Sequence, residues 1–282
     1  TSYAANELNQ YTNIFSASAP PREPTHDDDG NMTSTGYGWH YVWNGENRLI
    51  LASNENALVT YAYDHRGRMT WKTVAASNAP PSKAIRNVWD DFNIVAETVV
   101  QDTSTNTTYN VWGLDIDGTL QGAGGVGGLL AVISTLPLGE GQSEVGTVYL
   151  PCYDANGNIT EYVSVDGVIV AHRKYNPFGG TIAALGEANA FTHWYSTKPW
   201  CTDTGLSEYQ YRKYSPQFGR WLSQDPIGES GGGYSLYKFV NNWPIDTIDV
   251  LGLSFSISEM AVDVNYLVDR YNAWGLTGYP SV

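Results

Sequence analysis

The stretch Tyr61-Ala-Tyr-Asp-His-Arg-Gly-Arg-Met69 decides the fold of this chain, since it contains the end of one strand, a turn and the start of the next strand. Asp64 can cap the first strand because its side chain can bond the backbone of its own turn. Gly67 tolerates the positive φ that a hairpin turn demands. The stretch therefore predicts a β-hairpin.

The same four-residue phrase, two aromatic or apolar residues followed by Asn or Asp, recurs along the chain. Its other copies are Tyr41-Val-Trp-Asn44, Asn87-Val-Trp-Asp90, Pro151-Cys-Tyr-Asp154 and Arg173-Lys-Tyr-Asn176, with Asn110-Val-Trp-Gly113 as a variant. One hairpin cannot bury its aromatic face alone, so such units stack into a long, coiled sheet. Because exposed edges are hazardous, we expect the sheet to wind round on itself or to be capped.

Composition supports an all-β protein. The 282 residues include 20 Tyr, 10 Trp, 29 Gly and 13 Pro, a mixture typical of short strands joined by tight turns, and they suffice for one large β domain or two ordinary ones. The formal net charge of −14 repels phosphate backbones, which argues against nucleic-acid binding. It leaves open an ordinary acidic surface or attraction for a basic partner.

Two cysteines, Cys152 and Cys201, form no disulfide framework and show no zinc-like spacing. Cys152 lies in an apolar run, so we expect a buried, inert thiol there. No run of eighteen apolar residues exists, so we expect no membrane span. The chain begins with Thr1 without a signal peptide, and we expect a processed or excised piece of a longer protein.

The segment near the end is the most specific. It contains, in order, Tyr195-Ser-Thr-Lys198, Asp203-Thr-Gly-Leu206, Tyr211-Arg-Lys-Tyr-Ser-Pro216, Gly219-Arg-Trp-Leu-Ser-Gln-Asp-Pro-Ile-Gly228, Tyr237-Lys-Phe-Val-Asn-Asn242 and Asp249-Val-Leu-Gly-Leu253. The repeats resemble the tyrosine-aspartate (YD) repeat of Rhs proteins, Tc toxin C subunits and teneurins. Residues 191–253 resemble the Rhs-associated core that closes such repeats.

This resemblance implies a ribbon of antiparallel β-hairpin repeats that spirals into a hollow, barrel-like shell, or β-cocoon, around a C-terminal cargo, often a toxin. It divides the chain into a shell segment (1–190), a closing core (191–253) and the start of the cargo or a plug (254–282). It also implies a secreted or cell-surface bacterial protein. The partners would be its own cargo and, further, secretion machinery or other copies of the chain, since family shells are built from longer chains.

Asp225 and Asp249 each begin a turn phrase, Asp-Pro-Ile-Gly and Asp-Val-Leu-Gly. Turn formation alone explains an aspartate there, and Arg212 and Arg220 can serve as cross-strand partners of carboxylates. Two carboxyls brought together can instead share a proton and activate water against a peptide bond, while a guanidinium stabilises the charge. The residues by themselves leave both interpretations open.

The resemblance favours the second interpretation, an intramolecular aspartyl autoprotease and not a turnover enzyme. It implies that Asp225 and Asp249 are the carboxylate pair, that Arg212 assists them, and that the cut falls between Leu253 and Ser254. The chain departs from the family at Val250, where the motif has Pro. Because only proline fixes φ, we expect this departure to affect the cutting geometry.

After Leu253 the pattern becomes helical. Ser256 and Glu259 fit a capping box, and an apolar face follows at helical spacing (Met260, Val264, Leu267, Val268, Tyr271), with Gly275 as a stop. We expect a short C-terminal helix there, as the first part of the cargo or as a plug against the shell wall.

The remaining motifs do not indicate a binding site. Gly122-Ala-Gly-Gly-Val-Gly127 matches a dinucleotide fingerprint but lacks the βαβ context, so a glycine-rich turn or close backbone packing is the better interpretation. Asp27-Asp-Asp-Gly-Asn31 is read as a hairpin turn and not as a calcium loop. The five histidines show no metal spacing, so we expect neither a metal nor a cofactor.

Two alternatives to the shell stay open. Exposed aromatics on a β surface suit a cell-surface adhesion or glycan-binding protein. An acidic pair in a β scaffold would also suit a glycosidase. Aromatics that point into an enclosed space favour the shell, whereas an exposed aromatic stripe favours glycan binding.

Overall fold

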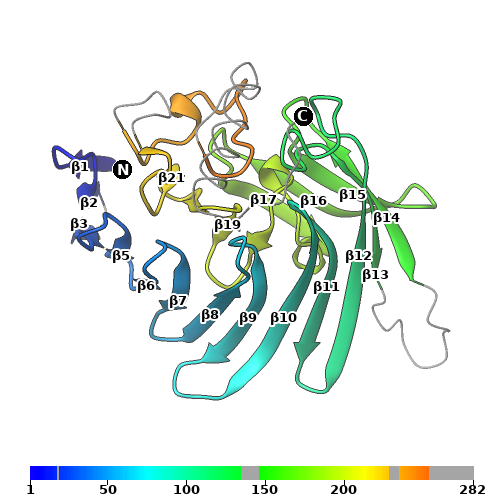
Figure 1. The fold of residues 1–282 in the computed structure, drawn as a ribbon, viewed down its shortest axis with the longest axis horizontal. Helices are drawn as coiled ribbons and strands as arrows, with labels where there is room; N and C mark the ends of the chain where they lie inside the picture. Colours follow the sequence, from blue (N-terminus) through cyan, green and yellow to red (C-terminus); the bar gives the residue numbers. More distant parts are fainter. Residues whose placement is uncertain (18, 135–145, 229–234, 254–282) are drawn as a thin grey trace.

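The computed structural model describes residues 1–17, 19–134, 146–228 and 235–253, and these ranges form an almost entirely antiparallel β structure. One fourteen-stranded sheet dominates, and its strands lie side by side in the order of the sequence. They are β4 (Thr25–His26), β5 (Met32–Ser34), β6 (His40–Trp43), β7 (Leu49–Ser53), β8 (Ala57–Tyr63), β9 (Met69–Ala76), β10 (Pro81–Asp90), β11 (Asn93–Gln101), β12 (Ser104–Trp112), β13 (Leu129–Ser134), β14 (Thr147–Tyr153), β15 (Ile159–Ser164), β16 (Ile169–Tyr175) and β17 (Thr181–Gly186). Figure 1 shows them as a curved wall.

The turns of the repeat share one geometry. Asp64 accepts hydrogen bonds at Oδ1 from the backbone N–H of Arg66 (2.9 Å) and Arg68 (3.0 Å), and Gly67 lies at φ +78°. The same bonds, from the second and fourth residues after the phrase, are accepted by Asn44, Asp154 and Asn176. The predicted hairpin chemistry is therefore present in the structure.

The Tyr or Trp before each turn also donates a hydrogen bond to a backbone carbonyl. Tyr63 donates its hydroxyl to the carbonyl of Leu49 (2.7 Å), and Trp89 donates its indole N–H to the carbonyl of Met69 (2.9 Å). Trp43, Trp112, Tyr153 and Tyr175 make equivalent bonds to the preceding hairpin. Since phenylalanine has no such donor, these bonds explain why the phrase uses Tyr and Trp.

Two smaller sheets complete the described part. β1 (Ser2–Ala5), β2 (Tyr11–Ser16) and β3 (Ala19–Arg22) form an N-terminal sheet, and β18 (Trp200–Cys201), β19 (Leu206–Glu208), β20 (Lys213–Ser215) and β21 (Arg220–Trp221) form another. Single 3-10 turns occur at η1 (Ala188–Ala190), η2 (Tyr195–Thr197) and η4 (Val240–Asn242).

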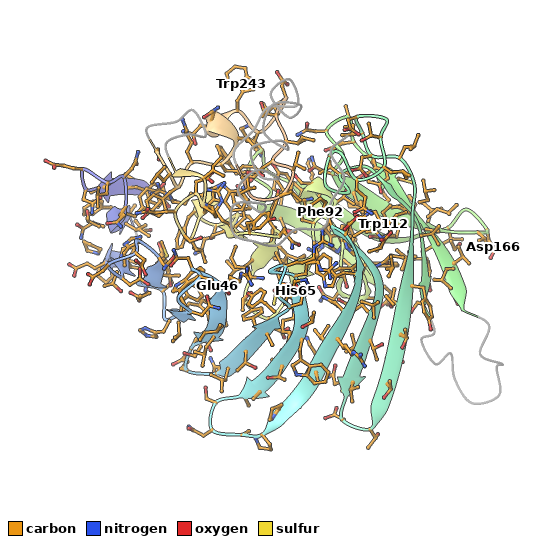
Figure 2. All side chains as sticks on the ribbon, viewed as in Figure 1. Glu46, His65, Phe92, Trp112, Asp166 and Trp243 are labelled. Atoms are coloured by element: carbon orange, nitrogen blue, oxygen red, sulfur yellow. The ribbon has the colours of Figure 1, made fainter. Side chains whose placement is uncertain are left out.

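The described residues of the closing segment (191–228 and 235–253) pack on the concave face of the wall (Figure 1). Leu206, Phe218 and Leu222 join the wall residues Tyr41 and Val59 in one core cluster. In Figure 2 Trp112 lies on this crowded inner side, where its ring meets His193 edge-on at 5.3 Å, whereas Trp243 projects from the surface. The wall thus buries its inner face against the closing segment.

The all-β class and the shell-like ribbon are confirmed, although the large sheet does not close and ends at β17 and β4. The predicted C-terminal helix (Ser256–Tyr271) lies outside the described residues. The prediction for Cys152 was wrong: its side chain is exposed, because the apolar run around it is an alternating strand whose residues point to both faces. Within the described part of the chain, no helix is long and apolar enough to cross a membrane.

Candidate functional site

The turn Asp249–Leu253 folds around its own aspartate. Asp249 Oδ1 accepts hydrogen bonds from the backbone N–H of Gly252 (2.6 Å) and of Leu253 (2.9 Å). Gly252 lies at φ +83°, and a Cβ there would lie 3.2 Å from both the Arg212 amide nitrogen and Tyr209 Cβ. Glycine therefore lets the turn lie directly against the backbone of Arg212, just before β20.

Arg212 brings the two predicted aspartates together. Its Nη2 lies 2.8 Å from Asp225 Oδ2 and 3.5 Å from Asp249 Oδ2, and the side chains of all three residues are buried. The guanidinium also donates from Nε to the carbonyl of Gly252 and from Nη1 to the carbonyl of Leu236 (3.2 Å). The arginine is thus fixed between both carboxylates and the backbone just before the predicted cut.

The position of Arg212 is set from a third side by Trp221. The guanidinium carbon lies 4.2 Å from the centre of the indole ring, a cation–π distance. Trp221 is fully buried among Tyr209, Tyr214 and Phe239. This aromatic cluster was not predicted as part of the site, although Trp221 lies inside the quoted motif.

Asp225 also forms the turn that its sequence predicts. Its Oδ1 accepts from the Ile227 amide (3.1 Å), and its carbonyl accepts from the Gly228 amide (2.9 Å). Turn formation and pairing with Arg212 use different oxygens, Oδ1 and Oδ2. The two interpretations of this aspartate are therefore compatible.

Asp249 is the electrostatically unusual member of the pair. Burial raises the pKa of its carboxyl above the ordinary value of 3.8, and the charge of Asp225 acts in the same direction, while Arg212 and the two turn amides oppose them. Its Oδ2 accepts no hydrogen bond from any described residue. The pKa of the Arg212 guanidinium is lowered by burial, against the pull of both aspartates. The arrangement makes Asp249 hold a proton more readily than an ordinary aspartate.

The glycine-rich turn, Gly122–Gly127, packs against the turn that carries Asp249. Gly124 lies at φ +61° and so close to Val250 that a Cβ would clash with the Val250 carbonyl oxygen and lie 2.8 Å from Cγ1. Ala123 and Val126 pack with Ile248 in one buried cluster. The interpretation of this glycine run as close backbone packing is confirmed, but its position behind the Asp249 turn was not predicted.

The predicted cut joins Leu253 and Ser254. Leu253 is buried, and Ser254 lies outside the described residues. Arg220, a predicted carboxylate partner, instead stacks on Tyr11 (3.9 Å) and donates to the carbonyl of Asn9 (2.7 Å). That prediction was wrong because the N-terminal sheet, far away in sequence, supplies its partners. Among the described residues, no group of three or more His, Cys, Asp or Glu side chains could hold a metal ion.

Comparison with known proteins places the fold. No family model matches the chain. Toxin subunit YenC2 of Yersinia entomophaga is 36% identical over 96 residues, which is 33% of this chain and 10% of that protein. Double-stranded DNA deaminase toxin A of Burkholderia cenocepacia is 23% identical over 251 residues, 82% of this chain and 17% of that protein.

The crystal structure of TcdB2–TccC3 superposes with a TM-score of 0.64 at 25% identity, covering 81% of this chain and 11% of that one. The chain spans about a tenth of the length of the YenC toxin subunits that it matches. The chain is therefore a homologue of Tc toxin subunits, which are Rhs-repeat shell proteins.

Proposed function

We propose that this chain is a wall and closing segment of a shell that encloses a C-terminal polypeptide cargo, and that it cleaves itself once, after Leu253. The observation that carries the proposal is the buried Arg212, which contacts both Asp225 and Asp249 while Asp249 holds the amides of Gly252 and Leu253. In this proposal residues 1–190 form the wall, 191–253 close it, and 254–282 begin the cargo.

The geometry supports a division of roles between the carboxyls. Asp225, in the closer ion pair with Arg212, takes a proton from a water molecule. Asp249, whose pKa is raised by burial, gives its proton to the Leu253 carbonyl oxygen as the water oxygen attacks the carbonyl carbon. As the adduct collapses, the C–N bond breaks: Asp225 passes the proton it took from water to the Ser254 nitrogen, and Asp249 takes back a proton from a hydroxyl of the adduct, leaving a carboxyl on Leu253 and an amine on Ser254.

The wall supports enclosure over glycan binding. The Tyr and Trp residues of the repeat donate hydrogen bonds to neighbouring backbone, so their polar ends are already used within the wall. The homologues are toxin subunits. We therefore infer a toxin-type cargo, a secreted or cell-surface bacterial setting, and contact with further shell subunits or secretion machinery as partners.

The test is to express the 282-residue chain and a longer form with a reporter domain after residue 282, and to measure intact mass and the N-terminal sequence of the products. We expect a break after Leu253, retention of both pieces under native conditions, and no break in Asp225→Asn or Asp249→Asn. Asp154→Asn is the matched control, since Asp154 is a turn aspartate with similar amide bonds but no arginine partner among the described residues. A wild-type chain that stays intact from pH 4 to 9 contradicts the self-cleavage.

A further inference from the structure

The turn just before Lys198 holds two adjacent residues in the left-handed region. Ser196 lies at φ 52°, ψ 28°, and Thr197 at φ 53°. Neither is glycine, and threonine is branched at Cβ, so both conformations are unfavourable for these residues. Such conformations persist only where the surroundings enforce them, and they concentrate at functional sites.

The surroundings enforce this turn from two sides. The Ser196 amide donates to Asn158 Oδ1 (2.7 Å), and the Thr197 hydroxyl donates to the Gly157 carbonyl (2.8 Å). The same hydroxyl accepts from the amide of Gly127 in the glycine-rich turn (2.9 Å). The strained turn is thus clamped between a hairpin turn of the wall and the glycine-rich turn behind Asp249.

The residue that follows this strained turn is a buried lysine. Lys198 is 7% exposed, and its Nζ donates to the Gly124 carbonyl at 2.5 Å. No carboxylate among the described residues lies within ion-pair distance of it, although its ammonium lies 5.5 Å from the centre of the Tyr209 ring. A buried ammonium without an ion-pair partner is expensive, so the fold retains it against a cost.

The lysine acts on the Asp249 turn through one residue. Gly124, which accepts its hydrogen bond, is the glycine packed against Val250, and Val250 directly follows Asp249. Burial lowers the pKa of Lys198 to about 8, while the charges of Asp115 and then Asp249 oppose that shift. The ammonium and the Asp249 carboxyl are therefore coupled both by contact and by charge.

Lys198, with a pKa of about 8, is mostly a cation at neutral pH. The pKa of His193 is lowered to about 3 by burial and by Lys198 itself, and the pKa of Tyr209 is raised by burial, so both are neutral. Asp115, whose pKa is raised by burial, accepts from the Gly125 amide (2.8 Å). Arg212 is the cation that contacts Asp249 directly, with its Nη2 3.5 Å from Oδ2.

We propose that Lys198 is a positioning residue for Asp249: held on the Gly124 carbonyl, it fixes the turn that carries Asp249 and supplies a second positive charge beside the carboxylate pair. The inference rests on the proposed self-cleavage for its purpose. When Asp249 gives its proton to the Leu253 carbonyl, a carboxylate forms in a buried site. A nearby ammonium, together with Arg212, lowers the free energy of that charge.

The test uses Lys198→Met, which removes charge and hydrogen bond, and Lys198→Gln, which keeps a donor for Gly124 but removes the charge. Circular dichroism and melting curves establish that each variant folds. Lys198→Arg, which keeps the positive charge, is the conservative variant. At neutral pH we expect Met and Gln to slow self-cleavage at least about ten-fold, with partial recovery in Arg. A merely structural lysine would slow Met far more than Gln and leave the pH profile in place.

A second readout separates this inference from the proposed function. In the full chain carrying Asp225→Asn, which stays intact, the Asp249 carboxyl is followed by ¹³C NMR as pH is varied. Loss of the Lys198 charge is expected to raise the Asp249 midpoint by about half a pH unit or more. An unchanged midpoint in both Met and Gln overturns the inference, even if the wild type cleaves itself. A shifted midpoint in a chain whose wild type never cuts supports the coupling and rejects the protease.

Discussion

Lys72 on β9 and Glu208 on β19 join the wall to the closing segment across 136 residues of sequence. The Lys72 Nζ lies 3.4 Å from Glu208 Oε1, and Lys213 approaches the same oxygen at 3.8 Å, all three side chains being buried. Burial works to raise the pKa of Glu208, but the two ammonium groups outweigh it and lower the pKa. One carboxylate thus pairs with two buried cations.

Glu208→Gln is therefore expected to destabilise the protein by about 3–5 kcal/mol, because it removes the ion-pair partner that two buried ammonium groups share. Glu46→Gln is the matched control: Glu46 pairs with Arg48 at 3.4 Å, but its side chain is 66% exposed, so the loss should stay below about 1 kcal/mol. Urea denaturation measures both. Equal losses would mean that Glu208 does not hold the closing segment.

Gly124→Ala should damage the site more than Gly118→Ala. Both glycines have positive φ, +61° and +81°, so both variants carry the backbone strain of about 1 kcal/mol. Only the Gly124 methyl meets Val250, whereas nothing lies within 4 Å of one at Gly118. We expect Gly124→Ala to lose a further 1–3 kcal/mol or so and to slow self-cleavage. If the two variants behave alike in denaturation and in cleavage, the glycine-rich turn does not support the Asp249 turn.

Asp249 gives the stability of the fold a distinctive pH dependence. Because its folded pKa is raised above 3.8, its contribution is fully present below that pH and is lost as pH rises through the raised value. Asp249→Asn cannot ionise and keeps an Oδ1 acceptor for the Gly252 and Leu253 amides. In the uncut Asp225→Asn background, the melting temperatures should therefore move in favour of the added Asp249→Asn change as pH rises from 4 to 8. A difference that moves towards the Asp225→Asn parent contradicts the assignment.

Val250→Pro restores the residue that the family motif carries. The Val250 amide donates no hydrogen bond within the described residues, so proline removes none, and it restricts the turn. We expect self-cleavage to accelerate by about two- to ten-fold through better orientation of the bond. The reciprocal variant, Pro226→Val in the Asp225 turn, should slow it. A slower Val250→Pro chain would show that this turn adopts a φ that proline cannot.

The parts of the fold set by local chemistry could be predicted from the sequence. Asp64 and Gly67 determine their turn through bonds to neighbours within four residues, so the hairpins and the all-β class follow directly. The resemblance to the Rhs core named Arg212, Asp225 and Asp249, and the structure brings these three together. Their chemistry remains a prediction.

The parts set by distant contacts could not be predicted. Arg220 donates a hydrogen bond to the carbonyl of Asn9, 211 residues away, and the glycine-rich turn packs against Val250. The local spacing of these residues does not predict such contacts, because the contacts depend on how the closing segment packs against the wall. Lys198 was quoted as part of a motif, but only its position on Gly124 gives it a role.

The strict order of the fourteen-stranded sheet has a consequence for how such walls change in evolution. Within the sheet, each strand from β5 to β16 pairs only with the strands before and after it in the chain. Duplication or loss of one whole hairpin therefore lengthens or shortens the wall without any other strand changing its partner. In the shell that we propose, a gain or loss of hairpins by unequal recombination would change the length of the wall, while the closing segment and its arginine keep their sequence.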